Sequence, residues 1–106
     1  MGIVYLIEDP ANRAYKIGAT KKKANGRIKE LQTGNSSELV LKETFETDYP
    51  FRLESMLHTR FQEYNVLNEW YDLPQETVCE FRKNCEDLNN IILSMKDNPF
   101  FAKGLK

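Results

Sequence analysis

The chain has 106 residues, of which 41% are hydrophobic and 29% are charged, and its formal net charge is −1. This length fits one domain and excludes two independent cores, and the composition excludes a disordered chain. The longest apolar runs fall far short of the roughly 20 residues that cross a bilayer, so we expect no membrane partner.

The N-terminal half predicts a hairpin, a helix and a third strand. Residues 3–7 are a short β-prone apolar run, which ends at the turn signal Glu-Asp-Pro-Ala-Asn. A second strand over 14–20 would pair with it as an antiparallel hairpin. Apolar spacing then predicts a short helix over 24–32 and a strand over 39–45 that can pair back onto the hairpin.

The C-terminal half predicts two more helices. Pro50 opens the first, and residues 65–68 break it. A short extended stretch over 69–73 precedes a long helix over 75–96. The expected apolar positions of the two helices are Phe51, Leu53, Met56, Leu57 and Phe61, and then Val78, Phe81, Cys85, Leu88, Ile92 and Met95.

These elements predict an α/β (α+β) fold with the order β-β-α-β-α-(β)-α, in which a small three-stranded antiparallel sheet is flanked by helices. We expect one domain, with residues 1–74 as its core and the helix and tail of 75–106 packed on that core.

Cys79 and Cys85 would lie about 240° apart around the helix axis, too far apart for a disulfide. We therefore interpret them as reduced thiols of an intracellular protein.

Charge and motif content narrow the possible chemistry. A basic run within residues 16–29 is typical of a solvated surface and also fits phosphate binding. With one histidine, no nucleophile motif, no zinc-type spacing and no Gly-rich phosphate loop, the common hydrolase and nucleotide sites have little support. What remains is a set of single polar residues on successive elements: Tyr5, Lys16, Arg27, Glu54, His58 and Glu69.

In these residues the chain resembles the GIY-YIG nucleases. Ile-Val-Tyr at 3–5 and Lys-Ile-Gly at 16–18 are similar to the two tripeptides that name the family. Arg27 lies where the family has an arginine on its first helix. Glu54 opens the run Glu-Ser-Met-Leu-His-Thr-Arg-Phe, which is similar to the metal-binding glutamate helix. The resemblance covers residues 2 to about 74 and includes the lysine variant of the second tripeptide, common in phages, large DNA viruses and bacteria.

The resemblance implies an endonuclease that hydrolyses phosphodiester bonds of nucleic acid, with DNA favoured. Glu54 would hold one Mg²⁺ or Mn²⁺ ion, and Arg27 would bind a phosphate oxygen. Tyr5 would be the general base or proton relay for the attacking water, and Lys16 is its expected cationic neighbour. His58 would lie on the same helical face as Glu54 and is a further catalytic candidate.

Six residues are expected to bind substrate: Gly18, Lys21, Lys22, Lys23, Asn65 and Glu69. Gly18 would allow close approach of phosphate to the backbone, although it also fits a hairpin end. Asn65 matches the asparagine of a Tyr-Asn pair in excision-repair members of the family, and Glu69 would form a salt bridge within the site. Leu31 stands where several family nucleases carry an additional His or Tyr base, which leaves proton abstraction to Tyr5.

Two other functions stay open at this stage. A catalytically idle GIY-YIG domain would bind nucleic acid or protein through Lys21–Lys23, while metal binding at Glu54 would be weak. Retention of Tyr5 and Arg27 beside that carboxylate argues against it. A structural protein would instead dimerise through residues 75–96 and the Phe100-Phe101 tail, so an oligomer is allowed but not predicted.

Overall fold

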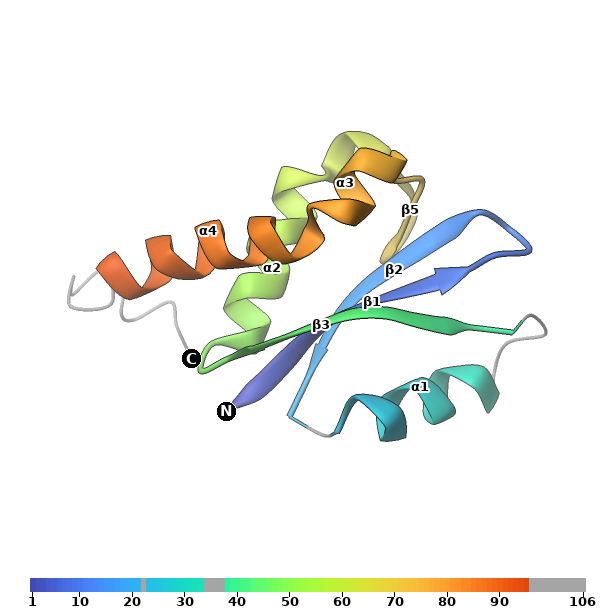
Figure 1. The fold of residues 1–106 in the computed structure, drawn as a ribbon, viewed down its shortest axis with the longest axis horizontal. Coiled ribbons are helices and arrows are strands. Elements are labelled where there is room, and N and C mark those ends of the chain that lie inside the picture. Colours follow the sequence, from blue (N-terminus) through green and yellow to red (C-terminus); the bar gives the residue numbers. More distant parts are fainter. Residues whose placement is uncertain (22, 34–37, 96–106) are drawn as a thin grey trace.

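The computed structural model describes residues 1–21, 23–33 and 38–95. Lys22 and the predicted tail, including Phe100 and Phe101, lie outside these ranges. Figure 1 shows the arrangement of the elements. In chain order they are β1 (Gly2–Asp9), β2 (Ala14–Thr20), α1 (Ala24–Thr33), β3 (Val40–Thr47), α2 (Pro50–Arg60), a 3-10 helix (Gln62–Tyr64), β4 (Asn65–Leu67), β5 (Trp70–Tyr71), α3 (Gln75–Cys79) and α4 (Phe81–Met95).

The sheet has five antiparallel strands in the order β3-β1-β2-β5-β4, so the prediction of three strands was wrong. The predicted hairpin is present as β1 and β2, in a register that pairs Tyr5 with Gly18. The additional strands follow α2: β5 pairs with the start of β2, and β4 pairs with β5. The observed element order therefore also differs from the predicted one.

The β4–β5 hairpin explains the missed strands. All three residues of β4 are exposed, so this strand lacks the apolar alternation that marks a strand in sequence. The side chain of Asn65 donates hydrogen bonds to the carbonyls of Asn68, at 2.7 Å, and Trp70, at 3.2 Å. Asn68 has a φ of 52°, a left-handed conformation that asparagine tolerates well. Local hydrogen bonds and pairing, rather than burial, thus define β4.

Helices cover both faces of the sheet (Figure 1): α1 lies on one face, and α2, α3 and α4 lie on the other. Strand alternation separates the apolar residues accordingly. Val4, Leu6 and Ile17 are fully buried with the residues of α2 and α4. Tyr5 and Ile7 point to the α1 side instead and form a second, smaller cluster with Leu39, Ile28 and Leu31.

Two predictions about the helices need correction. The expected helix over 75–96 is divided at Glu80, where the backbone has φ −97° and ψ 9°. The predicted core position Met95, at the end of α4, is 40% exposed. Phe51 is 51% exposed, because it lies outside the i, i+4 stripe that buries the neighbouring residues Leu53 and Leu57.

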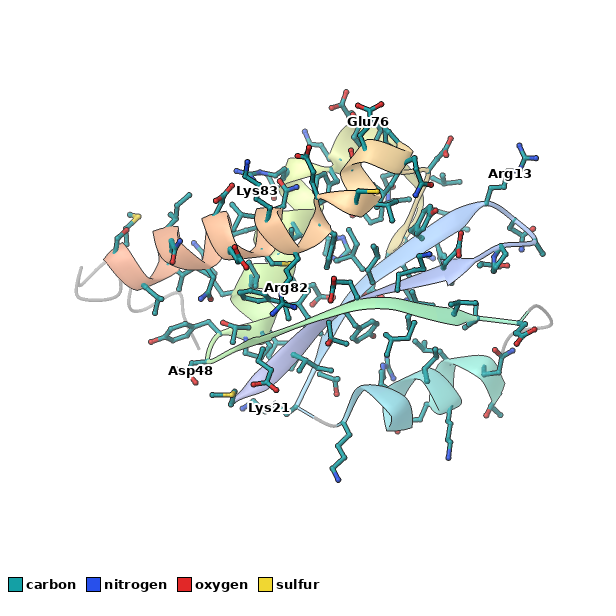
Figure 2. The ribbon with its side chains drawn as sticks, in the orientation of Figure 1. Arg13, Lys21, Asp48, Glu76, Arg82 and Lys83 are labelled. Atoms are coloured by element: carbon teal, nitrogen blue, oxygen red, sulfur yellow. The ribbon has the colours of Figure 1, made fainter. Side chains whose placement is uncertain are left out.

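Charged side chains lie around this core (Figure 2). Arg82 projects from the side of α4 that faces β3, whereas Lys83 projects from the opposite side, and Arg13 lies at the tip of the β1–β2 hairpin. Arg82 donates a hydrogen bond of 3.0 Å to the Thr44 carbonyl and thereby ties α4 to β3. Among the described residues, no helix has the length and apolar character needed to cross a membrane.

Candidate functional site

Tyr5 lies in β1, an interior strand of the sheet, and its side chain is held between two neighbours. Its ring passes over Gly18 on the adjacent strand β2, where a Cβ atom would overlap the phenol. From α1, Arg27 donates a hydrogen bond of 3.2 Å from Nε to the phenol oxygen. Tyr5 is only 2% exposed, so its ring is packed within the fold.

Arg27 is the cation next to Tyr5. Its Nη1 also forms an ion pair of 3.1 Å with Glu30, one turn further along α1. The hydrogen bond with Tyr5 is the main reason that the pKa of Arg27 is raised, so the guanidinium stays charged at any pH in use. The sequence suggested Lys16 for this position beside the phenol, but the side chain of Lys16 has a different partner.

Lys16 forms an ion pair with Glu69, with 2.6 Å between Nζ and Oε2. The ammonium group also lies 5.7 Å from the centre of the Trp70 ring, within the range of a cation–π contact. Burial alone would raise the pKa of Glu69, but the hydrogen bond and charge of Lys16 outweigh it and lower the pKa below its usual value. Glu69 is therefore an ionised carboxylate at neutral pH, held beside β2.

Glu54 and His58 lie on one face of α2, as their spacing of four residues requires. The distance between His58 Nε2 and Glu54 Oε2 is 3.5 Å. The other ring nitrogen, Nδ1, is hydrogen-bonded to the hydroxyl of Tyr71 in β5. Burial, together with the charges of Glu69 and Glu54, raises the pKa of Tyr71, so this hydroxyl keeps its proton.

The carboxylates of Glu54 and Glu69 and the imidazole of His58 converge. Each offers one ligand atom, and these atoms lie within 4.8 Å of one another. Oxygen and imidazole nitrogen donors at this spacing fit a divalent cation. The three residues line a cavity of about 500 Å³, together with Ser55, Gln62, Asn65, Asn68 and Tyr71.

Two of these cavity residues have roles that the sequence did not indicate. Asn65, expected to bind substrate, holds the β4–β5 turn through its side-chain amide. Tyr71, which sequence reasoning did not single out, positions His58. The Glu-Trp-Tyr run at 69–71 was the available signal: alternation along β5 sends Trp70 to one face and Tyr71 to the other.

Hydrogen bonds and ion pairs thus divide the expected site residues into two groups, Tyr5 with Arg27 and the Lys16–Glu69–Glu54–His58 group. Strand β2 connects them, since Lys16 and Gly18 lie two residues apart on the same face, about 7 Å along the strand. Within the described part of the chain, Tyr15 and Lys16 are the only residues of β2 that pair with β5. The Ile17 N–H also donates a hydrogen bond of 3.3 Å to the Glu69 carbonyl. Beyond Ile17, no described strand pairs with this side of β2, which has α2 on one face and Tyr5 on the other.

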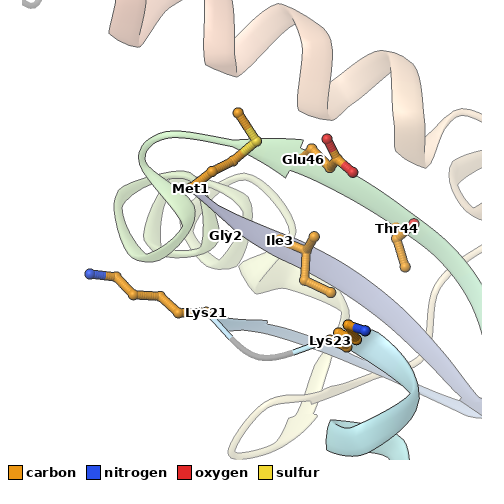
Figure 3. Close-up of a pocket in the computed structure, with 7 residues that line it drawn as sticks. All are labelled: Met1, Gly2, Ile3, Lys21, Lys23, Thr44 and Glu46. Carbon is orange, nitrogen blue, oxygen red and sulfur yellow. The ribbon is translucent and has the colours of Figure 1, made fainter.

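Lys21 and Lys23 line a different cavity, of about 390 Å³, at the far end of β2 (Figure 3). Its other lining residues are Met1, Gly2, Ile3, Thr44 and Glu46. Ile3 precedes Tyr5 by two residues on β1, and Thr44 is the residue of β3 that pairs with Tyr5. The cavity therefore lies on the same sheet face as the phenol, and both lysines are exposed there. Lys22 lies outside the described residues.

Comparison with models of protein families gives a match. A family described as the T5orf172 domain matches residues 2–86, from β1 into α4, and so includes every residue of both groups. This domain is of a class associated with nucleases and with nucleic-acid interaction. No curated protein and no solved structure matches the chain.

Proposed function

Because the chain belongs to the T5orf172 domain family, we propose that it is a divalent-metal-dependent endonuclease of the GIY-YIG type. Its substrate would be nucleic acid, with DNA favoured. One observation carries the proposal: the phenol of Tyr5, hydrogen-bonded to Arg27, covers Gly18, and two residues away along β2 Lys16 forms an ion pair with Glu69 of the Glu54, His58 and Glu69 cluster. A base, a phosphate-binding cation and metal-binding carboxylates would then surround one edge of the sheet.

Each step of phosphodiester hydrolysis has a candidate group. Tyr5 would act as the base in its phenolate form, which the hydrogen bond from Arg27 would stabilise, and would become a neutral phenol when it accepts the proton of the attacking water. The remaining N–H donors of Arg27 would bind a non-bridging phosphate oxygen, where negative charge grows. Glu54 would hold a divalent cation, which supplies charge neutralisation at the phosphate.

The other residues would position these groups and the substrate. Lys16, through its 2.6 Å ion pair, fixes the Glu69 carboxylate beside β2. Lys21 and Lys23, exposed on the sheet face that carries Tyr5, would attract the phosphates that flank the scissile bond. Such contacts are to the backbone, so an isolated domain of this kind would bind with little base specificity.

Nicking of supercoiled plasmid DNA tests the proposal. With Mg²⁺ or Mn²⁺, the intact chain should nick, and a chelator should stop it. Glu54→Ala should lower the rate by about 10²–10³-fold, the scale of losing one transition-state contact. Glu63→Ala is the matched control, because this carboxylate is exposed on the neighbouring 3-10 helix and should leave nicking unchanged.

Two results would contradict an endonuclease. Nicking that persists in chelator, or that is equal in the Glu54 and Glu63 variants, would mean that the carboxylate of Glu54 takes no part. If the intact chain does not nick but retards DNA as strongly as Glu54→Ala does, the protein is a binding module instead.

A further inference from the structure

We propose that Glu54, His58 and Glu69 form a three-ligand site for one first-row transition-metal dication, of the Mn²⁺, Co²⁺ or Zn²⁺ kind, and that His58 makes the site prefer such an ion to Mg²⁺. This rests on the proposed function and deepens it, because Glu54 is shared. A single carboxylate would suffice for Mg²⁺, and the imidazole and second carboxylate add what Mg²⁺ does not need.

The spacing of the donor atoms supports a shared ion. In a tetrahedral site with ligand distances near 2.1 Å, neighbouring ligand atoms are roughly 3.4 Å apart. His58 Nε2 and Glu54 Oε2 already lie 3.5 Å apart. The Glu69 donor completes a group of three ligand atoms that lie within 4.8 Å of one another.

The hydrogen bond between His58 and Tyr71 supports the role of the imidazole. A histidine that binds a metal through one nitrogen usually donates its other N–H to a fixed acceptor. Tyr71 is only 3% exposed, and its hydroxyl is hydrogen-bonded to Nδ1 of His58. A hydroxyl oxygen can accept the hydrogen bond that Nδ1–H donates. With the proton on Nδ1, the lone pair of Nε2 faces the Glu54 carboxylate, where an ion would bind.

The surroundings leave room for both an ion and its other ligands. Lys16 donates a hydrogen bond to Oε2 of Glu69. The other oxygen of this carboxylate can coordinate an ion while Oε2 accepts that hydrogen bond. The cavity of about 500 Å³ next to the three residues can hold water or a phosphate oxygen. Three protein ligands with an open position are typical of catalytic rather than structural metal sites.

Equilibrium dialysis with Co²⁺ and the visible absorption of bound Co²⁺ test the site without reference to activity. We expect one Co²⁺ per chain. Loss of a residue that only supports a metal ligand typically weakens metal binding by about 10- to 100-fold. His58→Gln and Glu69→Gln each remove a ligand itself, so each should weaken Co²⁺ binding by at least this factor. His58→Gln should also change the absorption bands of bound Co²⁺, because a nitrogen ligand is lost. Its Mg²⁺ affinity, measured by competition with Co²⁺, should stay within about threefold of that of the unaltered chain. The control Glu63→Gln should bind Co²⁺ as the unaltered chain does.

Tyr71→Phe gives an independent measurement if a ligand variant does not fold. It removes only the hydroxyl that positions His58, and it should weaken Co²⁺ binding by about 10-fold while Mg²⁺ binding is kept.

The inference is overturned if Co²⁺ binds equally well to the unaltered chain, His58→Gln and Glu69→Gln, or if His58→Gln weakens Mg²⁺ and Co²⁺ by the same factor. In that case Mg²⁺-dependent nicking could still support the endonuclease. The reverse result, Co²⁺ bound by all three ligands without any nicking, would refute the endonuclease and leave the metal site in place.

Discussion

The ring of Tyr5 in β1 passes directly over Gly18 in β2. An ideal Cβ atom at position 18 would lie 2.8 Å from Cε1 of the ring and would overlap the phenol oxygen. The absence of a side chain at Gly18 therefore determines where the hydroxyl lies and lets Arg27 reach it at 3.2 Å. The sequence led us to expect phosphate approach or a hairpin end for this glycine, and its surroundings add a further role, which is to leave space for the tyrosine ring.

Gly18→Ala should therefore displace the phenol. We expect loss of nicking together with a decrease of about 1–3 kcal/mol in the free energy of unfolding, the usual effect of overpacking. Urea titration and nicking rates measure the two effects. Gly26→Ala is the control, because a Cβ there meets nothing within 4 Å and should stabilise α1 by about 0.5–1 kcal/mol. Full activity in Gly18→Ala would mean that the position of Tyr5 does not matter.

The hairpin and the helical elements could be predicted because their signals are local. The run at 3–7, the turn after it and the strand at 14–20 define β1 and β2, and apolar spacing located α1 and α2. The break at Glu80 was not visible, since Val78 and Phe81 continue the apolar stripe across it with a three-residue step. A pattern of burial does not detect an interruption that keeps the same face buried.

The grouping of the site residues depended on tertiary contacts. Lys16 and Glu69 are 53 residues apart and meet only because the short strand β5 pairs with the start of β2. That pairing, which a three-stranded sheet lacks, takes the ammonium group to Glu69 and leaves Arg27 as the cation beside Tyr5. The salt bridge that the sequence led us to expect for Glu69 is thus present with Lys16 as its partner, and the missed strand pairing is the reason that this partner was not predicted.

Lys21 and Lys23 should contribute to binding through charge alone. Replacing both with glutamine should weaken DNA binding and make the dependence of log K on log salt shallower by about 2, at roughly 0.9 per phosphate contact. Fluorescence anisotropy over a salt series measures this slope. Arg13 and Lys83 lie at other places on the molecule (Figure 2), so their double glutamine variant changes net charge equally and should leave the slope unaltered. Equal slopes in both double variants would remove the two lysines from the DNA interface.

The two free cysteines should differ in reactivity. Cys79 is exposed, whereas Cys85 is fully buried, and burial raises the pKa of Cys85 to about 12. Because the thiolate is the reactive form, a thiol reagent at neutral pH should label one cysteine per folded chain and two in denaturant. Peptide mass spectrometry locates the label, and folded Cys79→Ser should remain unlabelled. Rapid labelling of Cys85 in the native state would argue against the packing of α4.

The ion pair of Lys16 and Glu69 should make stability depend on pH. The pKa of Glu69 is lowered in the folded state from 4.5, so its contribution is complete above pH 4.5 and is lost as the pH falls through the lower, folded-state value. In chelator, the difference in unfolding free energy between the unaltered chain and Glu69→Gln should therefore shrink as the solution is acidified. Since Glu69 is 45% exposed, solvent screening keeps this difference small. A difference that grows in acid would contradict the pairing.

Arg27→Ala should separate catalysis from binding. In the proposed mechanism the guanidinium would act on charge that develops at the phosphate and on the phenol oxygen, so its loss should lower the cleavage rate by about 10²–10³-fold. DNA affinity should fall only a few-fold, as for any one cation. Lys29→Ala removes an exposed positive charge from the same helix and should affect both quantities slightly. Single-turnover cleavage measures the rate, and fluorescence anisotropy measures the DNA affinity. Equal losses of rate and affinity in Arg27→Ala would mean that this arginine contributes to binding alone.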